Sequence, residues 1–241
     1  WAASSESVLA NSLRLGRETF RAQRPQRLYR PYRMTPGGPA LFFRDERLSD
    51  LIGFEYSRWH GSDAARHFVA ELERIADAAP GDERPVVSVI LDGENAWEYY
   101  PYNGYYFLDH LYEQICANPR IRPTTFDAVL RDNPIAPGQL DALVAGSWVY
   151  GTLSTWIGEV EKNRAWDLLC AAKQSYDLVI DSGRIDGARR TAATAQLARC
   201  ESSDWFWWFG AHNPSHVVET FDALFRANLK WLYSLLALPV P

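Results

Sequence analysis

One nearly unbroken apolar run stands out in the hydrophobic pattern of this chain, at residues 85–91, and it ends abruptly in Asp92, Gly93 and Glu94. A short run rich in Val and Ile predicts a strand buried on both faces, as in a parallel sheet between helices. The chain leaves such a strand at the face that carries catalytic groups in α/β folds. We therefore expect Asp92 to lie at a catalytic edge. The alternative is an ordinary loop whose acidic residues cap the next helix.

Strand patterns also occur before this run. Residues 1–3 have the pattern of a strand end, and a short helix opened by serine is expected at 4–13. Two further strands are expected at 28–34 and 40–44, because the turn signal Thr-Pro-Gly-Gly-Pro separates them.

Helical periodicity lies between these strands and the apolar run. Ser62 is expected to cap a helix in which apolar residues recur three and four positions apart as far as Ala76. The succession of strand, amphipathic helix and strand predicts a right-handed βαβ unit. A second helix is expected at 107–115, and Thr124 or Thr125 is expected to begin a short third one.

The second half of the chain has a different pattern. Residues 136–158 are loop-like and rich in aromatic residues and glycine, and no strand pattern follows residue 160. Long helical periodicities follow, and one helix is expected to present small residues to its neighbours: Ala188, Ala192, Ala195 and Ala198. We predict two domains, a partial β/α barrel at 1–118 and a helical domain at 119–241 with aromatic loops that line the substrate.

Composition and charge argue against two kinds of binding partner, nucleic acids and membranes. The chain has 241 residues, of which 47% are hydrophobic and 23% charged, as in ordinary globular proteins. A net charge of −5 argues against a nucleic-acid partner, because nucleic-acid-binding surfaces are usually basic. The basic stretch at 14–33 is broken by prolines and is interpreted as a solvated loop. Because no apolar run is long enough to span a bilayer, we expect no membrane partner.

Cysteine and histidine spacing gives no sign of a metal centre. The three cysteines, Cys116, Cys170 and Cys200, are far apart and form no CxxC pair. They are compatible with a reducing compartment, so we expect a cytoplasmic location, and each is interpreted as a small buried hydrophobe. The histidines lack HExxH spacing. We expect no cofactor and no metal ion.

Two other features suggest carbohydrate chemistry and an incomplete chain. Ten Trp and twelve Tyr residues gather beside glycine and polar residues, and the apolar face of a sugar ring stacks on flat aromatic rings. The chain begins at Trp1 without an initiator methionine or a signal sequence. We therefore expect that it is a piece of a longer protein.

Several separated blocks carry a resemblance to a known family. They are Leu-Asp-Gly-Glu-Asn-Ala-Trp-Glu at 91–98, Glu-Ser-Ser-Asp-Trp-Phe-Trp-Trp at 201–208, and shorter blocks at 42–45, 48–54, 146–148, 155–158 and 161–167. In these blocks the chain resembles glycoside hydrolase family 57, and in particular its amylase and amylopullulanase-like members. The blocks cover nearly the whole chain.

The resemblance implies a fold and an activity. The implied fold is the C-terminal part of an incomplete seven-stranded β/α barrel followed by a helical bundle. The implied activity is retaining cleavage of α-1,4 glucans, with α-1,6 linkages as an open alternative, in starch, glycogen or maltooligosaccharides. Asp92 matches the general acid/base of the family. The implied substrate-binding residues are Glu94, Trp97, Trp148, Trp156, Glu201, Asp204, Trp205 and Trp207, and for each Trp the alternative is packing between the two domains.

The sequence also departs from the family pattern. The nucleophilic Glu of the family belongs to a segment that precedes this chain, and Glu6 lacks its sequence context. The histidine motif found near the N-terminus of family members is also missing. Residues 210–213 are Gly-Ala-His-Asn, where many relatives carry acidic residues.

Three functions therefore remain open: an α-glucan hydrolase, an α-glucan transglycosylase such as a branching enzyme or 4-α-glucanotransferase, and a non-catalytic carbohydrate-binding remnant. The block around Asp92 favours the hydrolase. The expected partners are an α-glucan and either the missing N-terminal barrel segment or another copy of the chain. We expect the isolated chain to be inactive and prone to associate, because a partial barrel exposes sheet edges.

Overall fold

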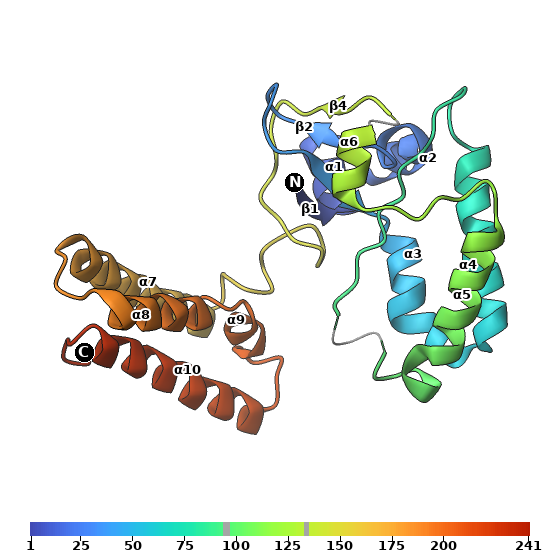
Figure 1. The fold of residues 1–241 in the computed structure, drawn as a ribbon. Helices are drawn as coiled ribbons and strands as arrows, with labels where there is room; N and C mark the ends of the chain where they lie inside the picture. The colour runs from blue at the N-terminus through green and yellow to red at the C-terminus, as the bar shows by residue number, and fades with distance from the viewer. Residues whose placement is uncertain (94–96, 133–134) are drawn as a thin grey trace. The chain divides into compact units, whose positions relative to one another are not determined.

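A computed structural model describes residues 1–93, 97–132 and 135–241 of the chain. The described residues form two compact units, Trp1–Thr152 and Leu153–Pro241, each with its own apolar core (Figure 1). The first unit combines a small sheet with helices, and the second is helical. The fold is therefore mixed α/β.

A four-stranded sheet organises the first unit, in the order β1–β3–β2–β4. β1 (Ala2–Ser5) and β3 (Leu41–Arg44) are parallel neighbours over their whole length. β2 (Tyr32–Arg33) is antiparallel to β3, and β4 (Gly138–Gln139) is parallel to β2. Every residue of β3 is buried, so the first core forms around this strand.

The strands predicted at 28–34 and 40–44 are both present, although the first is reduced to β2. The predicted turn joins them. Gly37 has a φ of +75°, which glycine adopts without steric cost, and Gly38 N–H donates to the Thr35 carbonyl at 3.0 Å. The strand and helix predicted at the start of the chain are confirmed as β1 and α1 (Glu6–Ser12).

The apolar run at 85–91 is extended, but it is not the regular strand that we predicted. Its one bridge joins Ser88 to Arg44 in parallel, and Asp45 N–H donates to the Ser88 carbonyl at 2.8 Å. Val87, Val89 and Leu91 pack against the main core, whereas Val86 packs on a smaller cluster that contains Phe42. Both faces are thus apolar, but only Ser88 is fully buried, because a single bridge holds the segment to β3.

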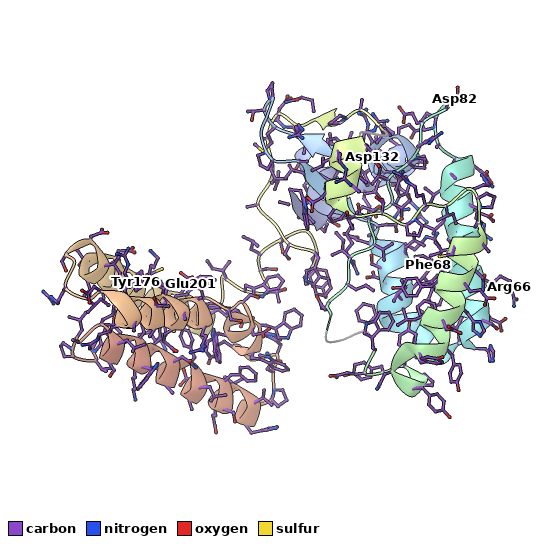
Figure 2. All side chains as sticks on the ribbon, in the orientation of Figure 1. Arg66, Phe68, Asp82, Asp132, Tyr176 and Glu201 are labelled. Atoms are coloured by element: carbon purple, nitrogen blue, oxygen red, sulfur yellow. The ribbon has the colours of Figure 1, made fainter. Side chains whose placement is uncertain are left out.

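Helices cover the sheet and extend the first core. In addition to α1 they are α2 (Arg17–Arg27), α3 (Glu46–Asp50), α4 (Gly61–Asp77), α5 (Tyr105–Ala117) and α6 (Phe126–Asp132), with a π turn η1 (Leu51–Glu55) and 3-10 turns η2 (Tyr56–Arg58) and η3 (Pro101–Gly104). The helices predicted around 62–76 and 107–115 are confirmed as α4 and α5, which pack along each other (Figure 1). On α4, Phe68 is buried and Arg66 points outward (Figure 2).

Two local predictions in this unit are wrong. α4 begins at Gly61 with His60 in the N-cap position, so Ser62 lies inside the first turn, where its hydroxyl is 2.9 Å from His60 Nδ1. The basic stretch expected to be a solvated loop contains α2, an 11-residue helix whose Phe20 is buried. By contrast, the predicted cap of α6 is confirmed at Thr125, whose hydroxyl accepts from Ala128 N–H at 3.3 Å.

The second unit consists of α7 (Val160–Asp181), α8 (Gly187–Cys200), α9 (Asp204–Trp208) and α10 (Ser215–Leu235). The three long helices predicted here are confirmed. The predicted face of small residues on α8 is wrong, because all four of those alanines are exposed. The buried face lies beside it and contains Ala193, Gln196, Leu197 and Cys200, at the helical spacing of three and four.

Residues 119–152 belong to the first unit, whereas we predicted a domain boundary after residue 118. Phe126 of α6 stacks on Phe42 of β3 with ring centroids 4.2 Å apart, and β4 pairs with β2. These contacts join α6 and β4 to strands that are far away in the sequence, and no local sequence pattern predicts them.

The cysteines differ in burial from what we predicted. Cys200 is fully buried, and burial raises the pKa of its thiol to about 11. Cys116 and Cys170, however, are exposed on their helices. No described helix combines the length and apolarity needed to cross a membrane.

A tight loop at 146–152 is fixed against the start of α1. Ser5 Oγ donates to the Ser147 carbonyl at 2.9 Å, and Ser147 N–H donates to the Thr152 carbonyl at 3.1 Å. A Cβ on Gly146 would lie 2.3 Å from the Gly151 carbonyl oxygen and 2.8 Å from a methyl group of Val8. Only glycine therefore fits at position 146.

We predict that Gly146→Ala lowers the free energy of unfolding of the first unit by about 1–3 kcal/mol, because the new methyl group collides with backbone as well as side chain. Gly53→Ala is the matched control, since a Cβ there meets no atom within 4 Å. Urea denaturation followed by tryptophan fluorescence measures both. Equal stability of the two variants would contradict the packing described for this loop.

Candidate active site

Three parallel segments of the first unit end at one edge. β1, β3 and the extended segment at 85–91 run in the same direction, and β3 lies between the other two. Glu6 follows β1, Arg44 ends β3, and Asp92 follows the extended segment. Because the carboxyl ends of parallel strands share an edge, these charged residues belong to one face of the unit.

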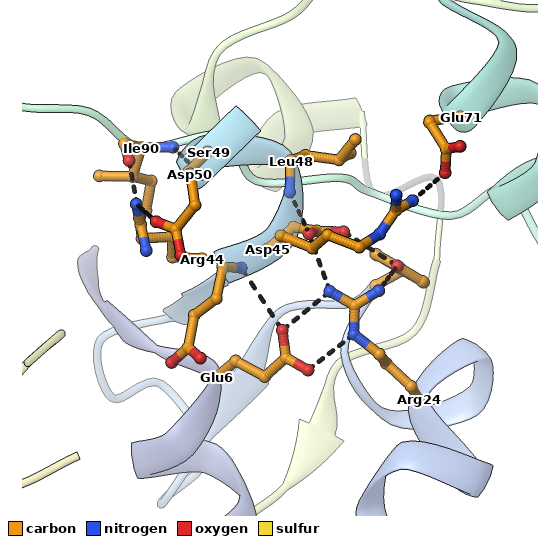
Figure 3. A network of polar contacts seen from close by, with 12 residues as sticks. Glu6, Arg24, Arg44, Asp45, Leu48, Ser49, Asp50, Glu71 and Ile90 are labelled. Carbon is orange, nitrogen blue, oxygen red and sulfur yellow. Dashed lines mark hydrogen bonds and ion pairs between the residues drawn. The ribbon is translucent and has the colours of Figure 1, made fainter. Parts of the chain in front are cut away.

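A largely buried ion network joins the ends of β1 and β3 (Figure 3). Arg24 of α2 forms two hydrogen bonds with Glu6, at 2.6 and 2.8 Å, and an ion pair with Asp45 at 2.8 Å. Asp45 is fully buried and also accepts a hydrogen bond from Tyr29 O–H at 3.0 Å. It caps the start of α3 by accepting from Leu48 N–H at 2.9 Å. This network fixes how β1, α2, β3 and α3 meet.

The electrostatics of the network follow from burial and charge. Burial by itself lowers the pKa of Arg24, but the hydrogen bonds that it donates to Glu6 and the negative charges of Asp45 and Glu6 outweigh this effect and raise that pKa. Burial and the charge of Asp45 also raise the pKa of Tyr29, although Arg24 opposes this. Arg24 therefore stays charged and Tyr29 stays neutral over the ordinary pH range.

Arg44 connects the network to the segment that carries Asp92. Its Nε donates to the Ile90 carbonyl at 2.9 Å, and its Nη2 donates to Asp50 at 2.6 Å (Figure 3). The Trp148 ring lies over its guanidinium, 5.7 Å from the ring centroid, in a cation–π contact. The anchored loop at 146–152 thus places Trp148 at the same edge as the residues just before Asp92.

Asp92 itself is exposed, as is Gly93 after it. Glu94 lies outside the described residues. Trp97 is half-buried and packs on Gly104, where an added Cβ would lie 2.8 Å from the indole ring. The ring centroids of Trp97 and Tyr100 are 5.5 Å apart. This geometry favours packing within the first unit over sugar stacking for Trp97.

The remaining residues expected to bind sugar lie in the second unit. The rings of Trp156 and Trp207 have centroids 5.8 Å apart. The Trp205 indole N–H donates to the Arg199 carbonyl at 2.8 Å, and its ring packs on Phe225, so it too is held by packing. Glu201 and Asp204 are both exposed.

A buried lysine holds the aromatic segments of this second unit together. The Lys162 ammonium donates to the Thr155 carbonyl at 2.7 Å and to the Phe206 carbonyl at 2.9 Å, and the side chain is fully buried. Burial lowers the pKa of Lys162, and the charges of Glu159 and Glu161 partly oppose this. These hydrogen bonds position the residues next to Trp156 and Trp207.

Sequence reasoning did not single out Arg44 or Lys162 as site residues. Both lie in blocks that carry the family resemblance, at 42–45 and 161–167, and this was the available signal. Lys162 donates to backbone carbonyls, which leave no mark in a sequence, and Arg44 contacts Trp148, a residue more than a hundred positions away. Within the described residues, no cluster of three or more His, Cys, Asp or Glu side chains is arranged to hold a metal ion.

The chain thus belongs to a class of protein in which an α/β unit is followed by a helical unit. In the α/β unit, charged groups lie at the carboxyl ends of parallel segments. A family model of glycosyl hydrolase family 57 matches residues 7–134, a range that includes Asp92. The match covers more than half of the chain, and the chain belongs to this family. Members of the family act on glycosidic bonds.

Solved structures share the fold. One is a family 57 branching enzyme from Thermococcus kodakaraensis in complex with glucose, with a TM-score of 0.69 and 16% identity over 86% of this chain and 46% of that one. Another is a family 57-type branching enzyme from Pyrococcus horikoshii, with a TM-score of 0.70 and 15% identity over 95% of this chain and 48% of that one. The chain thus spans about half the length of these enzymes. No curated protein matches its sequence.

We predict that Arg24→Met lowers the free energy of unfolding of the first unit by roughly 3–5 kcal/mol, because it leaves the buried charge of Asp45 without its cation. Arg66→Met is the control. Arg66 is 70% exposed and pairs with Asp63 at the surface, so its loss is expected to cost less than about 1 kcal/mol. Denaturant titrations of both variants test this, and similar losses of stability would show that the network does not hold the edge together.

Proposed function

We propose that this chain is part of a retaining enzyme that cleaves α-1,4 or α-1,6 bonds in glucans such as starch, glycogen or maltooligosaccharides, with Asp92 as the general acid/base. One observation carries the proposal. Within the range matched by the family model, Asp92 follows an extended segment parallel to β3, at the edge where carboxyl ends meet. A carboxyl group in this position can protonate the oxygen of a departing sugar.

Retaining cleavage also needs a nucleophilic carboxylate roughly 5–5.5 Å from the acid. In the described residues, Glu6 and Asp45 are bound by Arg24, and Asp50 is bound by Arg44. Each of these three carboxylates is thus already engaged by an arginine in this structure. The proposal therefore takes the nucleophile from elsewhere in the enzyme.

Each unit by itself carries aromatic residues that could contact sugar. Trp148 is 39% exposed and is held by Arg44 at the edge that carries Asp92, so its ring is available to a sugar. In the second unit, Trp156 and Trp207 form a ring pair, and Glu201 and Asp204 offer exposed carboxylates for sugar hydroxyl groups. We infer that Trp148 contacts a glucose unit near the bond that is cleaved, and that the four residues of the second unit also contact glucan.

We further infer that the sheet belongs to an incomplete seven-stranded β/α barrel. Support comes from the likeness to two branching enzymes that are about twice as long. On this view an N-terminal barrel segment, or a second copy of the chain, covers the free edges of the sheet.

A transglycosylase is the second candidate, and a specific observation favours it: both solved structures described above are branching enzymes. The chemistry up to the covalent intermediate is common to the two candidates. They differ in whether water or the hydroxyl group of another glucan resolves that intermediate.

We predict that Asp92→Asn in the enzyme that contains this chain lowers kcat on amylose by at least about a hundredfold, because general acid–base catalysis contributes roughly 10²–10⁴ to the rate. The fold should persist, since Asp92 is exposed. Asp82→Asn is the matched control, at an exposed position in the turn before residues 85–91, and it should leave the rate unchanged (Figure 2). Circular dichroism checks the fold of both.

The same assay separates the candidate functions. New reducing ends without new branches indicate hydrolysis, whereas α-1,6 branches released by a debranching enzyme indicate a branching transferase. Unchanged turnover in Asp92→Asn would remove Asp92 from the mechanism. Glucan binding without any turnover by the complete enzyme would favour the binding remnant and contradict the proposal.

A further inference from the structure

The surface at the start of α5 exposes a group of tyrosines. Tyr102, Tyr105 and Tyr106 are 77%, 62% and 53% exposed, and Tyr99 and Tyr112 beside them in sequence are exposed as well. We call Tyr102, Tyr105 and Tyr106 the tyrosine platform. Exposed aromatic groupings on globular proteins commonly mark binding sites, because a buried position would otherwise be favoured for rings of this size.

The rings of the platform support one another without being buried. Tyr106 contacts Tyr102 and Tyr105 edge to face, and both pairs of ring centroids are 5.3 Å apart. The core below is already filled by other side chains of the same stretch, since Tyr100, Phe107 and Leu111 are buried. The platform is therefore an outward-facing arrangement and not an unfinished part of the core.

The backbone under the platform is held in an uncommon conformation. Tyr102 and Asn103 both have a φ of +53°, and Gly104 has a φ of +77°. Left-handed conformations cost non-glycine residues roughly 1–2 kcal/mol each, so neighbouring structure must hold them. Trp97 does so here, because its indole ring lies directly against Gly104. The packing of Trp97 thus fixes the turn that presents Tyr102 to solvent.

Charge restricts what this surface can bind. Glu98, Asp109 and Glu113 are exposed in the same stretch, and the whole chain carries a net charge of −5. Nucleic acids, phosphorylated ligands and a second copy of this chain would all bring like charge to an acidic surface. Under the proposed function the ligand is an uncharged glucan, whose flat apolar faces suit the rings and whose hydroxyl groups donate to carboxylates. Sugars combine these properties.

We propose that the tyrosine platform binds an α-glucan chain at glucose units away from the bond that reacts. This inference rests on the proposed function, and it names a binding surface that lies after Asp92 in the same unit. Stacking on Tyr102 and Tyr105 would contribute affinity for long glucans without taking part in the chemistry.

Native electrophoresis of the complete protein through gels that contain glycogen tests the platform. The variant Tyr102→Ala/Tyr105→Ala should bind glycogen at least about fivefold more weakly than the unchanged protein, because two ring contacts are lost. Tyr102→Phe/Tyr105→Phe keeps both rings and should bind within about twofold of the unchanged protein. Trp231→Ala removes an aromatic ring that is 56% exposed on α10, and it should not change binding. Thermal unfolding of each variant checks its fold.

The outcomes separate this inference from the proposed function. If the unchanged protein binds glycogen and the double alanine variant binds equally well, the platform inference fails and the proposed function stands. Failure of the unchanged protein to bind glycogen would overturn both. Sedimentation analysis addresses the other occupant: a dimer that the double alanine variant breaks, with glycogen binding intact, would make the platform a contact between copies and overturn the glucan site.

Discussion

The buried carboxylate of Asp45 is the constraint on which the first unit depends. It lies at the end of β3 and receives Arg24, Tyr29 O–H and the N–H of Leu48. A buried charge is tolerated only when it is paired and hydrogen-bonded, so the elements that bring these partners must all assemble around it. Through Arg24 the same network reaches Glu6 and therefore the end of β1.

This constraint also determines the contacts along the edge of the sheet. Arg44 directly precedes Asp45. It donates a hydrogen bond to the Ile90 carbonyl and forms a cation–π contact with the Trp148 ring. The irregular segment before Asp92 thus has a defined place although it forms only one bridge with β3. A functional site is positioned more precisely when the residues around it are held by their own contacts. Here Arg24 and Arg44 supply these contacts at the ends of β1 and β3.

Local pattern predicted the elements of this chain well and their partners poorly. Helical periodicity located α4, α5 and the long helices of the second unit, and turn chemistry located the β2–β3 hairpin. The exposed alanines of α8 show where periodicity fails, because small residues on two adjacent faces give the same pattern. Arg24 read as a solvated charge because its partners lie far along the chain, at Glu6 and Asp45. The sequence pointed to Asp92 because a strand-like run ends there, and its catalytic role stays a prediction.

The central claim is that the edge formed by Arg44, Trp148 and the segment before Asp92 faces the glucan. Mapping of amide and indole NMR shifts during titration with maltoheptaose tests it most directly. The account predicts shifts for the amides of Asp92 and Gly93, for the Trp148 indole and for the loop at 146–152. Shifts confined to other parts of the chain, with none at this edge, would contradict it.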